Sequence, residues 1–243
     1  MTMKENKDLI LRGLRIDWSG IDGESYLRRI PGIASLESLE FRRPVTFFVG
    51  ENGSGKSTLL EAIAVKYGFN PEGGTRNYSF STRASHSELW DHITLSKGTA
   101  MARGGYFLRA ESFYNVASAE EEYSKEGGTP LYLHSQSHGE SFLTVVREYF
   151  GPGGFYIMDE PEAALSPQRQ MSLLVRMSEC ASQGAQFIVA THSPVLLALP
   201  DEEILSFDGD QISPCGYEDT ESYKVMEMFI NYRDRILEYL LKE

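Results

Sequence analysis

The sequence predicts an α/β fold in which a mostly parallel central sheet is flanked by helices. Apolar runs of strand length alternate along the chain with runs of helical periodicity, which is the pattern of strand–helix–strand units. Several of the strand-like runs are continuously apolar, as expected of strands that are buried on both faces. With 243 residues the chain is long enough to bury such a core.

The expected elements follow from this periodicity and from the Gly and Pro residues between the runs. The first part contains strands at 9–18, 34–41 and 45–49 and a helix from Lys56 to about Gly68. The middle contains a loop-dominated stretch at 68–104, a strand at 105–110, a helix at 111–125, a break at 126–130 and a helix at 139–149. The last part contains a strand within 155–161, a helix at 167–183, strands at 186–194 and 202–207, and a helix at 221–242.

A glycine-rich stretch connects the third strand to the first helix. It reads GENGSGKST and meets the pattern G-x-x-x-x-G-K-[ST] in full at Gly50, Gly55, Lys56 and Ser57. Glycines allow successive N–H groups to point into one hollow, and the helix that follows adds its free N-terminal N–H groups. Lys56 supplies a charge for the outer phosphates, and the Ser57 hydroxyl is placed to bind Mg²⁺.

The loop is therefore expected to bind a nucleoside triphosphate. A flexible Gly/Ser turn with a chance lysine is the alternative, and the strand before and the helix after the loop argue against it. The other loop residues belong to the same predicted site: Glu51, Asn52, Gly53, Ser54 and Thr58.

An acidic pair ends the apolar strand within "FYIMDEP". Asp159 and Glu160 are delivered to the carboxyl edge of the sheet, which is the edge where the phosphate loop also lies. Asp159 can hold Mg²⁺, directly or through water, and Glu160 can act as the general base that polarises an attacking water. A strand that simply ends in two solvated acids is the alternative, and it is weakened by the complete phosphate loop upstream.

His192 closes the run "FIVATH" at the end of another predicted strand. An imidazole there could hydrogen-bond the γ-phosphate or the attacking water, so His192 is a candidate catalytic residue. A lone histidine is more often structural, and it is the Thr-His-Ser-Pro context after a buried strand that favours function.

Composition narrows the classes of partner. The net charge is −12, and residues 201–243 alone carry 4 basic and 12 acidic side chains. Such a body repels phosphate backbone, so nucleic-acid binding stays open but has no basic footprint. No run approaches the roughly 20 apolar residues that span a bilayer, so direct membrane insertion is not expected. The N-terminal stretch "MTMKENKDLI" has no apolar h-region, and a cytoplasmic location is expected.

Together, "GENGSGKST", "DEPEAALS" and "ATH" resemble the nucleotide-binding domain of the ABC ATPase superfamily in order and spacing. Within it the chain is similar to stand-alone ATPases and to the ATPase heads of chromosome-maintenance and recombination-repair proteins. The resemblance implies a P-loop NTPase fold of ABC type with an antiparallel N-terminal β part. It also implies ATP and Mg²⁺ as ligands and two copies that close head to tail around ATP.

The superfamily has a signature, Leu-Ser-Gly-Gly-Gln, that caps the ATP held by the opposite protomer. The matching stretch here is "QSHGES", with Ser137, Gly139 and Glu140 in the expected places and His138 in place of the first glycine. The resemblance therefore implies that Ser137 and Gly139 contact the partner's nucleotide. An ordinary helix N-cap at Ser137 would use the same hydroxyl and is the alternative.

Two family features are altered. Arg109 occupies the place where the Mg²⁺-binding glutamine is expected. Arginine cannot bind a metal. Whether Arg109 contacts phosphate there, or Glu111 or Ser112 approaches the ion, is left open. The helical lobe is short, so we expect one domain over 1–243 in which 68–138 forms an insertion with a reduced lobe. For the aromatic that stacks on adenine, Tyr26 and Phe41 are candidates, and Tyr26 is preferred.

The expected function is ATP binding and hydrolysis by a homodimer that drives or gates an unidentified protein partner. One alternative is the ATP-binding subunit of a membrane transporter. The other is a nucleotide-dependent switch that does not hydrolyse ATP, which the unusual His138 and Arg109 would suit.

Overall fold

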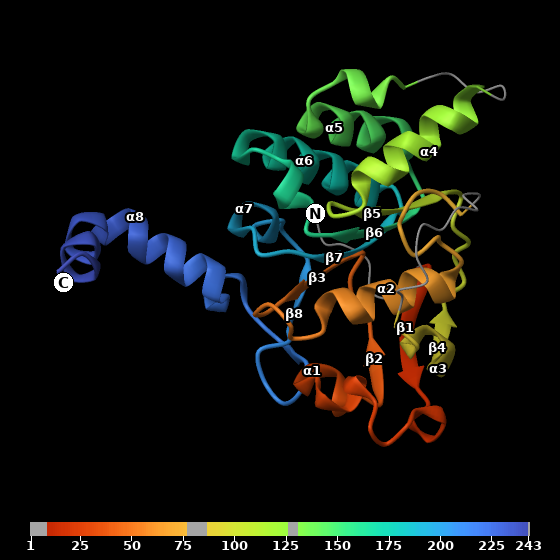
Figure 1. Ribbon diagram of the computed structural model, residues 1–243, viewed down its shortest axis with the longest axis horizontal. Coiled ribbons are helices and arrows are strands. Elements are labelled where there is room, and N and C mark those ends of the chain that lie inside the picture. Colours follow the sequence, from red (N-terminus) through yellow and green to blue (C-terminus); the bar gives the residue numbers. More distant parts are fainter. Residues whose placement is uncertain (1–8, 77–86, 126–130, 243) are drawn as a thin grey trace.

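A six-stranded sheet forms the centre of the computed structural model, which describes residues 9–76, 87–125 and 131–242 (Figure 1). The strand order is β5-β6-β7-β3-β8-β9, and all neighbours are parallel except β8 and β9. The strands are β3 (Val45–Val49), β5 (Gly105–Arg109), β6 (Phe155–Asp159), β7 (Gln186–Ala190), β8 (Glu203–Ser206) and β9 (Ser213–Pro214). The expected α/β class with a mostly parallel sheet is confirmed.

Apolar layers cover both faces of this sheet, because successive residues of a strand point to opposite sides. In β3, Phe48 joins the layer built around α2 (Lys56–Tyr67), while Phe47 joins the layer on the opposite face. That opposite layer contains α4 (Phe113–Lys125), α5 (His138–Tyr149), α6 (Pro167–Ser182) and α7 (Pro194–Leu197). Burial on both faces explains why the strands read as continuous apolar runs.

A second, antiparallel sheet packs against α2. Its order is β2-β1-β4, from β1 (Leu11–Ile16), β2 (Ser38–Glu40) and β4 (Ile93–Lys97). The antiparallel N-terminal part is thus confirmed, but its third strand lies inside the stretch 68–104 that was expected to be loop-dominated. That expectation is wrong at 89–97, where the short helix α3 (Leu89–His92) leads into β4, and buried Ile93 anchors the strand in the core.

The buried amide of Gln186 joins the two sheets. Its Oε1 accepts the Leu11 backbone N–H at 2.8 Å, and its Nε2 donates to the Leu11 carbonyl oxygen at 2.8 Å. A buried amide without partners is costly, so this double hydrogen bond fixes where β1 meets β7. It thereby helps to hold α2, and the loop that precedes α2, between the sheets.

Several element boundaries differ from expectation. The strand expected at 34–41 shrinks to β2, because a short helix that begins at a proline, α1 (Pro31–Ala34), precedes it. The strand expected at 186–194 ends at Ala190, and Ser193 caps α7 instead. The helix expected from 111 begins at Phe113, and the break expected at 126–130 lies outside the described residues.

The last helix, α8 (Glu221–Leu240), extends away from the body of the molecule (Figure 1). It is kinked at Tyr232, whose backbone angles are not helical. Its contacts with the body come from its first turns, beside α7 and a 3₁₀ turn at Tyr217–Asp219. Within the described part of the chain, no helix is long and apolar enough to cross a membrane.

Candidate nucleotide site

The glycine-rich loop between β3 and α2 has the backbone that the sequence pattern requires. Gly50, Gly53 and Gly55 have φ angles of 140°, 82° and 101°, a region that side chains with a Cβ disfavour. A Cβ on Gly55 would also lie 2.6 Å from Ile30 Cγ2 and 2.8 Å from Ile33 Cγ1, because α1 and the residue before it pack directly beneath the loop. The glycines therefore serve both the turn and the close packing below it.

Lys56 lies inside the hollow of the loop. Its side chain is buried, and Nζ donates to the carbonyl oxygens of Gly50 at 2.6 Å and Glu51 at 2.7 Å. Burial lowers the pKa of Lys56, and the nearby carboxylates of Glu160, Asp208 and Asp159 partly oppose that shift. The ammonium group is thus held at the centre of the loop, where phosphate oxygens could replace the carbonyl oxygens as its acceptors.

Ser57 and Asp159 meet across the carboxyl edge of the sheet. The Ser57 hydroxyl donates to Asp159 Oδ1 at 2.9 Å, although the two residues are 102 positions apart. Burial raises the pKa of Asp159 to about 6, while Arg109 and the Ser57 hydroxyl act in the opposite direction. A buried carboxylate of this kind gains from a nearby cation.

The donor set of Ser57 and Asp159 fits Mg²⁺. A hydroxyl and a carboxylate are hard oxygen ligands, and Mg²⁺ is commonly held by one or two carboxylates together with phosphate oxygens and water. Within residues 9–76, 87–125 and 131–242, no cluster of three or more His, Cys, Asp or Glu side chains is arranged to hold a metal. A magnesium ion at this edge would therefore depend on the nucleotide for its remaining ligands.

Arg109 fills the place beside Asp159. Its Nη1 lies 2.6 Å from Glu61 Oε2 on α2, and its Nε lies 3.6 Å from Asp159 Oδ2. Nη1 also donates to the Pro71 carbonyl oxygen at 3.2 Å, while the buried Nε has no hydrogen-bond acceptor among the described residues. The cation next to Asp159 is thus supplied by the chain itself.

The other two residues considered for the glutamine's place lie differently. Glu111 is 90% exposed and its Oε2 is 3.9 Å from Arg109 Nη2, while the Ser112 hydroxyl donates to the Glu72 carbonyl oxygen. A hollow of about 370 Å³ adjoins these groups; it is lined by Ser57, Arg109, Ala110, Glu111, His138, Asp159, Glu160 and Ala163. Glu111 can therefore reach this hollow, whereas Ser112 is engaged with the backbone.

Glu160 has an unusual backbone for a residue with a side chain. Its φ and ψ are 49° and 51°, in the left-handed region, and its N–H donates to the Ala190 carbonyl oxygen at 2.9 Å. The turn continues into Pro161–Ala164. Such strained residues often occur at functional sites, and this one places the Glu160 side chain in the wall of the same hollow as Ser57 and Asp159.

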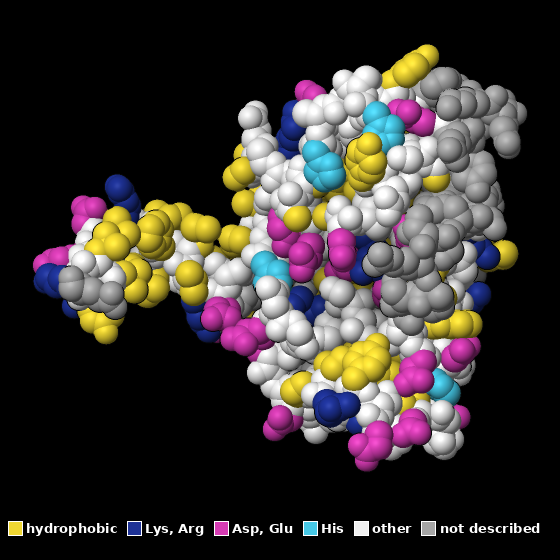
Figure 2. All heavy atoms as spheres, viewed as in Figure 1, with side chains coloured by type: hydrophobic (Ala, Val, Ile, Leu, Met, Phe, Trp, Pro, Cys, Tyr) yellow, Lys and Arg dark blue, Asp and Glu magenta, His cyan; other side chains and the backbone are white. Residues whose placement is uncertain are grey.

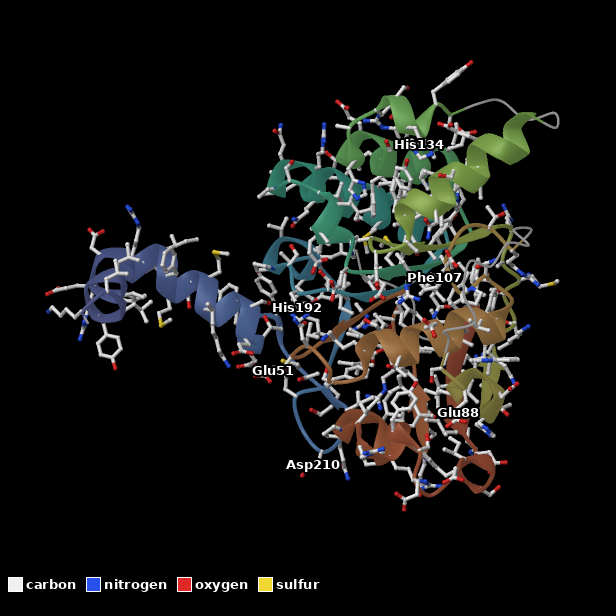
Figure 3. The ribbon with its side chains drawn as sticks, viewed as in Figure 1. Glu51, Glu88, Phe107, His134, His192 and Asp210 are labelled. Carbon is white, nitrogen blue, oxygen red and sulfur yellow. The ribbon has the colours of Figure 1, made fainter. Side chains whose placement is uncertain are left out.

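His192 lies at the end of β7, on the edge to which the loop residue Glu51 also belongs (Figure 3). Glu162 holds its backbone: Oε1 accepts the His192 N–H at 2.5 Å, and Oε2 accepts the Thr191 hydroxyl at 2.8 Å. The buried Nε2 of His192 has no hydrogen-bond partner in the described part of the chain. The ring is thus positioned by its backbone and keeps one free nitrogen.

Comparisons with known proteins find ATP-binding relatives. A family model described as "AAA domain" matches residues 27–100, and one described as "AAA domain, putative AbiEii toxin, Type IV TA system" matches residues 108–198. The ribose import ATP-binding protein RbsA of Roseobacter denitrificans is 22% identical over 243 residues, which cover 89% of this chain and 47% of that protein. The chain is thus similar over most of its length to ATP-binding proteins of the ABC type.

Other relatives of this chain are similarly distant. The xylose import ATP-binding protein XylG of Moorella thermoacetica is 20% identical over 90% of this chain and 49% of its own length, so the chain spans about half the length of the curated relatives it matches. Among solved structures, cbiO1 of Clostridium perfringens, part of the transporter complex cbiONQ, matches with a TM-score of 0.51 at 16% identity, covering 96% of this chain and 99% of its own. The SMC head domain of Thermotoga maritima matches with a TM-score of 0.47 at 16% identity, covering 86% of this chain and 100% of its own.

The signature-like stretch begins α5. Ser137 is the N-cap, and a capping box joins it to Glu140, whose Oε2 accepts the Ser137 N–H at 3.0 Å. A Cβ on Gly139 would lie 2.9 Å from the Ala164 carbonyl oxygen and 2.6 Å from Arg169 Nη1, so packing alone requires a glycine. The N-cap alternative is therefore seen directly, and contact of Ser137 and Gly139 with a partner's nucleotide stays a prediction.

The two aromatic candidates for adenine stacking differ in how exposed their rings are. Phe41 is completely buried in the core, so no ring face is left for a base. Tyr26 is 47% exposed and starts a 3₁₀ turn at Tyr26–Arg29, and its role stays a prediction.

Asp208, Glu61 and Glu162 contribute to the site but were missed from the sequence. Asp208 follows β8, and its Oδ1 accepts the Glu51 N–H at 2.6 Å, which fixes the start of the phosphate loop. The signal for Asp208 was the same as for Asp159, an acid directly after an apolar strand. Glu61 and Glu162 carry no such signal, because their partners come from other parts of the chain.

Proposed function

We propose that this chain binds and hydrolyses ATP as a homodimer with nucleotide between the protomers, and that the cycle drives or gates a protein partner. The observation that carries the proposal is the meeting of Ser57 and Asp159, at 2.9 Å, beside a glycine loop that has Lys56 at its centre. Relatives named as ATP-binding proteins support ATP as the nucleotide.

The loop residues have distinct roles in this proposal. The loop N–H groups and the Lys56 ammonium bind the phosphates, with the α2 N-terminus adding its positive dipole end. Ser57 and Asp159 hold Mg²⁺, which when bound supplies positive charge against the phosphate oxygens. Asp208 keeps the loop in shape through the Glu51 N–H.

Glu160 and His192 are the proposed catalytic residues. The Glu160 carboxylate accepts a proton from the attacking water, and its left-handed backbone directs the side chain into the hollow beside Asp159. Nε2 of His192 has no partner among the described residues, and in this proposal it hydrogen-bonds the γ-phosphate or that water. Glu162 has a positioning role, because it holds the Thr191–His192 backbone.

In the proposed dimer, the α5 N-terminus with Ser137 and Gly139 faces the partner's phosphate loop. The free N–H groups of a helix N-terminus suit a phosphate, and the exposed position of Ser137 leaves that end accessible. A cytoplasmic location belongs to the same proposal. Tyr26 is proposed as the residue that contacts adenine.

A transporter subunit is the second candidate, favoured by relatives named for ribose and xylose import. On that proposal a membrane protein would co-purify with the chain and contact the short lobe formed by α4 and α5. A switch without hydrolysis is the third candidate, favoured by the native cation Arg109 at the predicted metal site.

Replacement of Glu160 tests the proposal. Glu160→Gln should reduce phosphate release at least about 100-fold, the size typical of losing a general base, and should give an ATP-bound dimer that outlives the wild-type one. Glu179→Gln makes the same chemical change on the exposed face of α6 and should leave turnover unchanged. Phosphate release and light scattering on purified proteins measure both quantities. Wild-type turnover in Glu160→Gln would remove Glu160 from its role, and no turnover in the wild type would favour the switch.

A further inference from the structure

We propose that α8 is a clasp that pairs with α8 of a second copy of this chain and holds two copies together without nucleotide. The helix leaves the body and shows apolar side chains along its length (Figure 2). None of its described residues is buried within the chain. An exposed apolar helix face gains free energy when a partner covers it, and the spacing, area and charge of α8 point to a second α8 as that partner.

The apolar side chains of α8 follow one repeated spacing. Val225, Met226, Phe229 and Ile230 are at i, i+1, i+4 and i+5, which places them on one side of the helix. The same spacing recurs after the kink, in the segment from Ile236 to Leu241. Both segments of the helix therefore carry an apolar face, the pattern of a helix that packs against another helix.

Polar residues lie on the opposite side of α8. Lys224, Glu227 and Asn231 are at i, i+3 and i+7, opposite Phe229. The helix is thus amphipathic, and its polar side suits water even when the apolar side is covered.

The exposed apolar area is large enough for a stable dimer. Six apolar side chains at these spaced positions are 39% to 77% exposed. They offer an area on the order of 600 Å², the upper end of the roughly 300–600 Å² of the largest patch on a typical monomer. It approaches the roughly 800 Å² that each partner contributes to a standard interface. The apolar side of α8 thus has about the size of one half of a small protein–protein interface.

Charge favours a second copy over a membrane surface. Residues 221–242 carry four basic and four acidic side chains, whereas the whole chain has a net charge of −12. Helices that lie on anionic membranes carry an excess of Lys and Arg on the polar side, which α8 lacks. Two bodies of −12 repel each other, so a neutral, apolar helix that extends away from the body is the surface where two copies can approach.

The position of α8 connects the clasp to the nucleotide site. Glu221 and Lys224, in the first turn of the helix, line a hollow of about 740 Å³ together with Asn52 and Gly53 of the phosphate loop. The connection rests on the proposed homodimer with ATP between the protomers. Two copies that are already joined at α8 would close around ATP in an intramolecular step, because the joint raises the effective concentration of the partner site.

Phe229→Glu and Asn231→Glu form a matched pair, because each adds one carboxylate to α8, two residues apart, on opposite sides. We expect the nucleotide-free wild type to be a dimer by light scattering at micromolar concentration. Phe229→Glu should raise the dimer dissociation constant at least about 100-fold, as for loss of a hot-spot aromatic, and Asn231→Glu should leave it nearly unchanged. Circular dichroism should show both variants folded, since no described residue of α8 is buried.

Two outcomes would overturn the clasp: a monomeric wild type without nucleotide, or equal dimerisation of Phe229→Glu and the wild type. A dimer that both substitutions weaken equally would also overturn it, because the apolar side would then have no special role. The proposed ATPase activity can fail independently of the clasp, because a nucleotide-free dimer that Phe229→Glu weakens does not require ATP hydrolysis. If both proposals hold, the specific ATPase rate of Phe229→Glu falls on dilution while that of the wild type does not.

Discussion

The Arg109–Glu61 ion pair allows the altered metal site to be tested through stability. The side chains are only 17% and 14% exposed, and Nη1 lies 2.6 Å from Oε2, so each charge depends on the other for its lost hydration. Arg109→Gln leaves the Glu61 carboxylate unpaired and should lower the free energy of unfolding by about 3 kcal/mol, the lower end for a broken buried pair. Glu61→Gln should have a smaller effect, of about 1–2 kcal/mol, because Arg109 keeps Asp159 at 3.6 Å.

The decisive measurement is the free energy of unfolding of the double variant. In the double variant Glu61 no longer carries a charge, and the loss of Arg109 beside Asp159 is common to Arg109→Gln and the double variant, so Arg109→Gln/Glu61→Gln should recover about 2 kcal/mol relative to the sum of the single changes. Urea unfolding of the nucleotide-free proteins in EDTA measures all four free energies. The exposed pair Arg176–Glu179 is the control, with an expected coupling below about 0.5 kcal/mol. Coupling between Arg109 and Glu61 as weak as in this control would refute the argument that Arg109 neutralises the metal site.

Two further changes act on the phosphate and metal positions. Lys56→Ala removes the buried ammonium and should weaken ATP binding by about 1.5–3 kcal/mol, which calorimetry would report as a loss of roughly tenfold to 150-fold; undiminished affinity would contradict its role. Asp159 has a folded-state pKa of about 6 against an ordinary 3.8, so its contribution to stability is full below pH 3.8 and is lost as the pH rises through about 6. In EDTA, the wild type should therefore lose up to about 3 kcal/mol more than Asp159→Asn between pH 4 and pH 7. Identical pH dependence of the two proteins in urea titrations would contradict this.

Sequence reasoning worked where a signal is local. The phosphate loop and the two acids after β6 are contiguous motifs, and the strands of the central sheet are buried on both faces, so their apolar runs could be read directly. It failed at 89–97, where β4 is short and its exposed residues dilute the pattern, and at Phe41, where aromatic chemistry says nothing about burial.

By itself the sequence determined the chemistry of the loop and the class of the central sheet, because backbone conformation and strand periodicity depend on neighbouring residues. Only the tertiary structure decided which distant side chains complete the site: Glu61 meets Arg109 across 48 positions, and Asp208 meets Glu51 across 157. It also decided that Ser137 is already used as a helix cap and that α8 lies outside the core. These outcomes depend on which surfaces the folded chain brings into contact, and no local pattern encodes that choice.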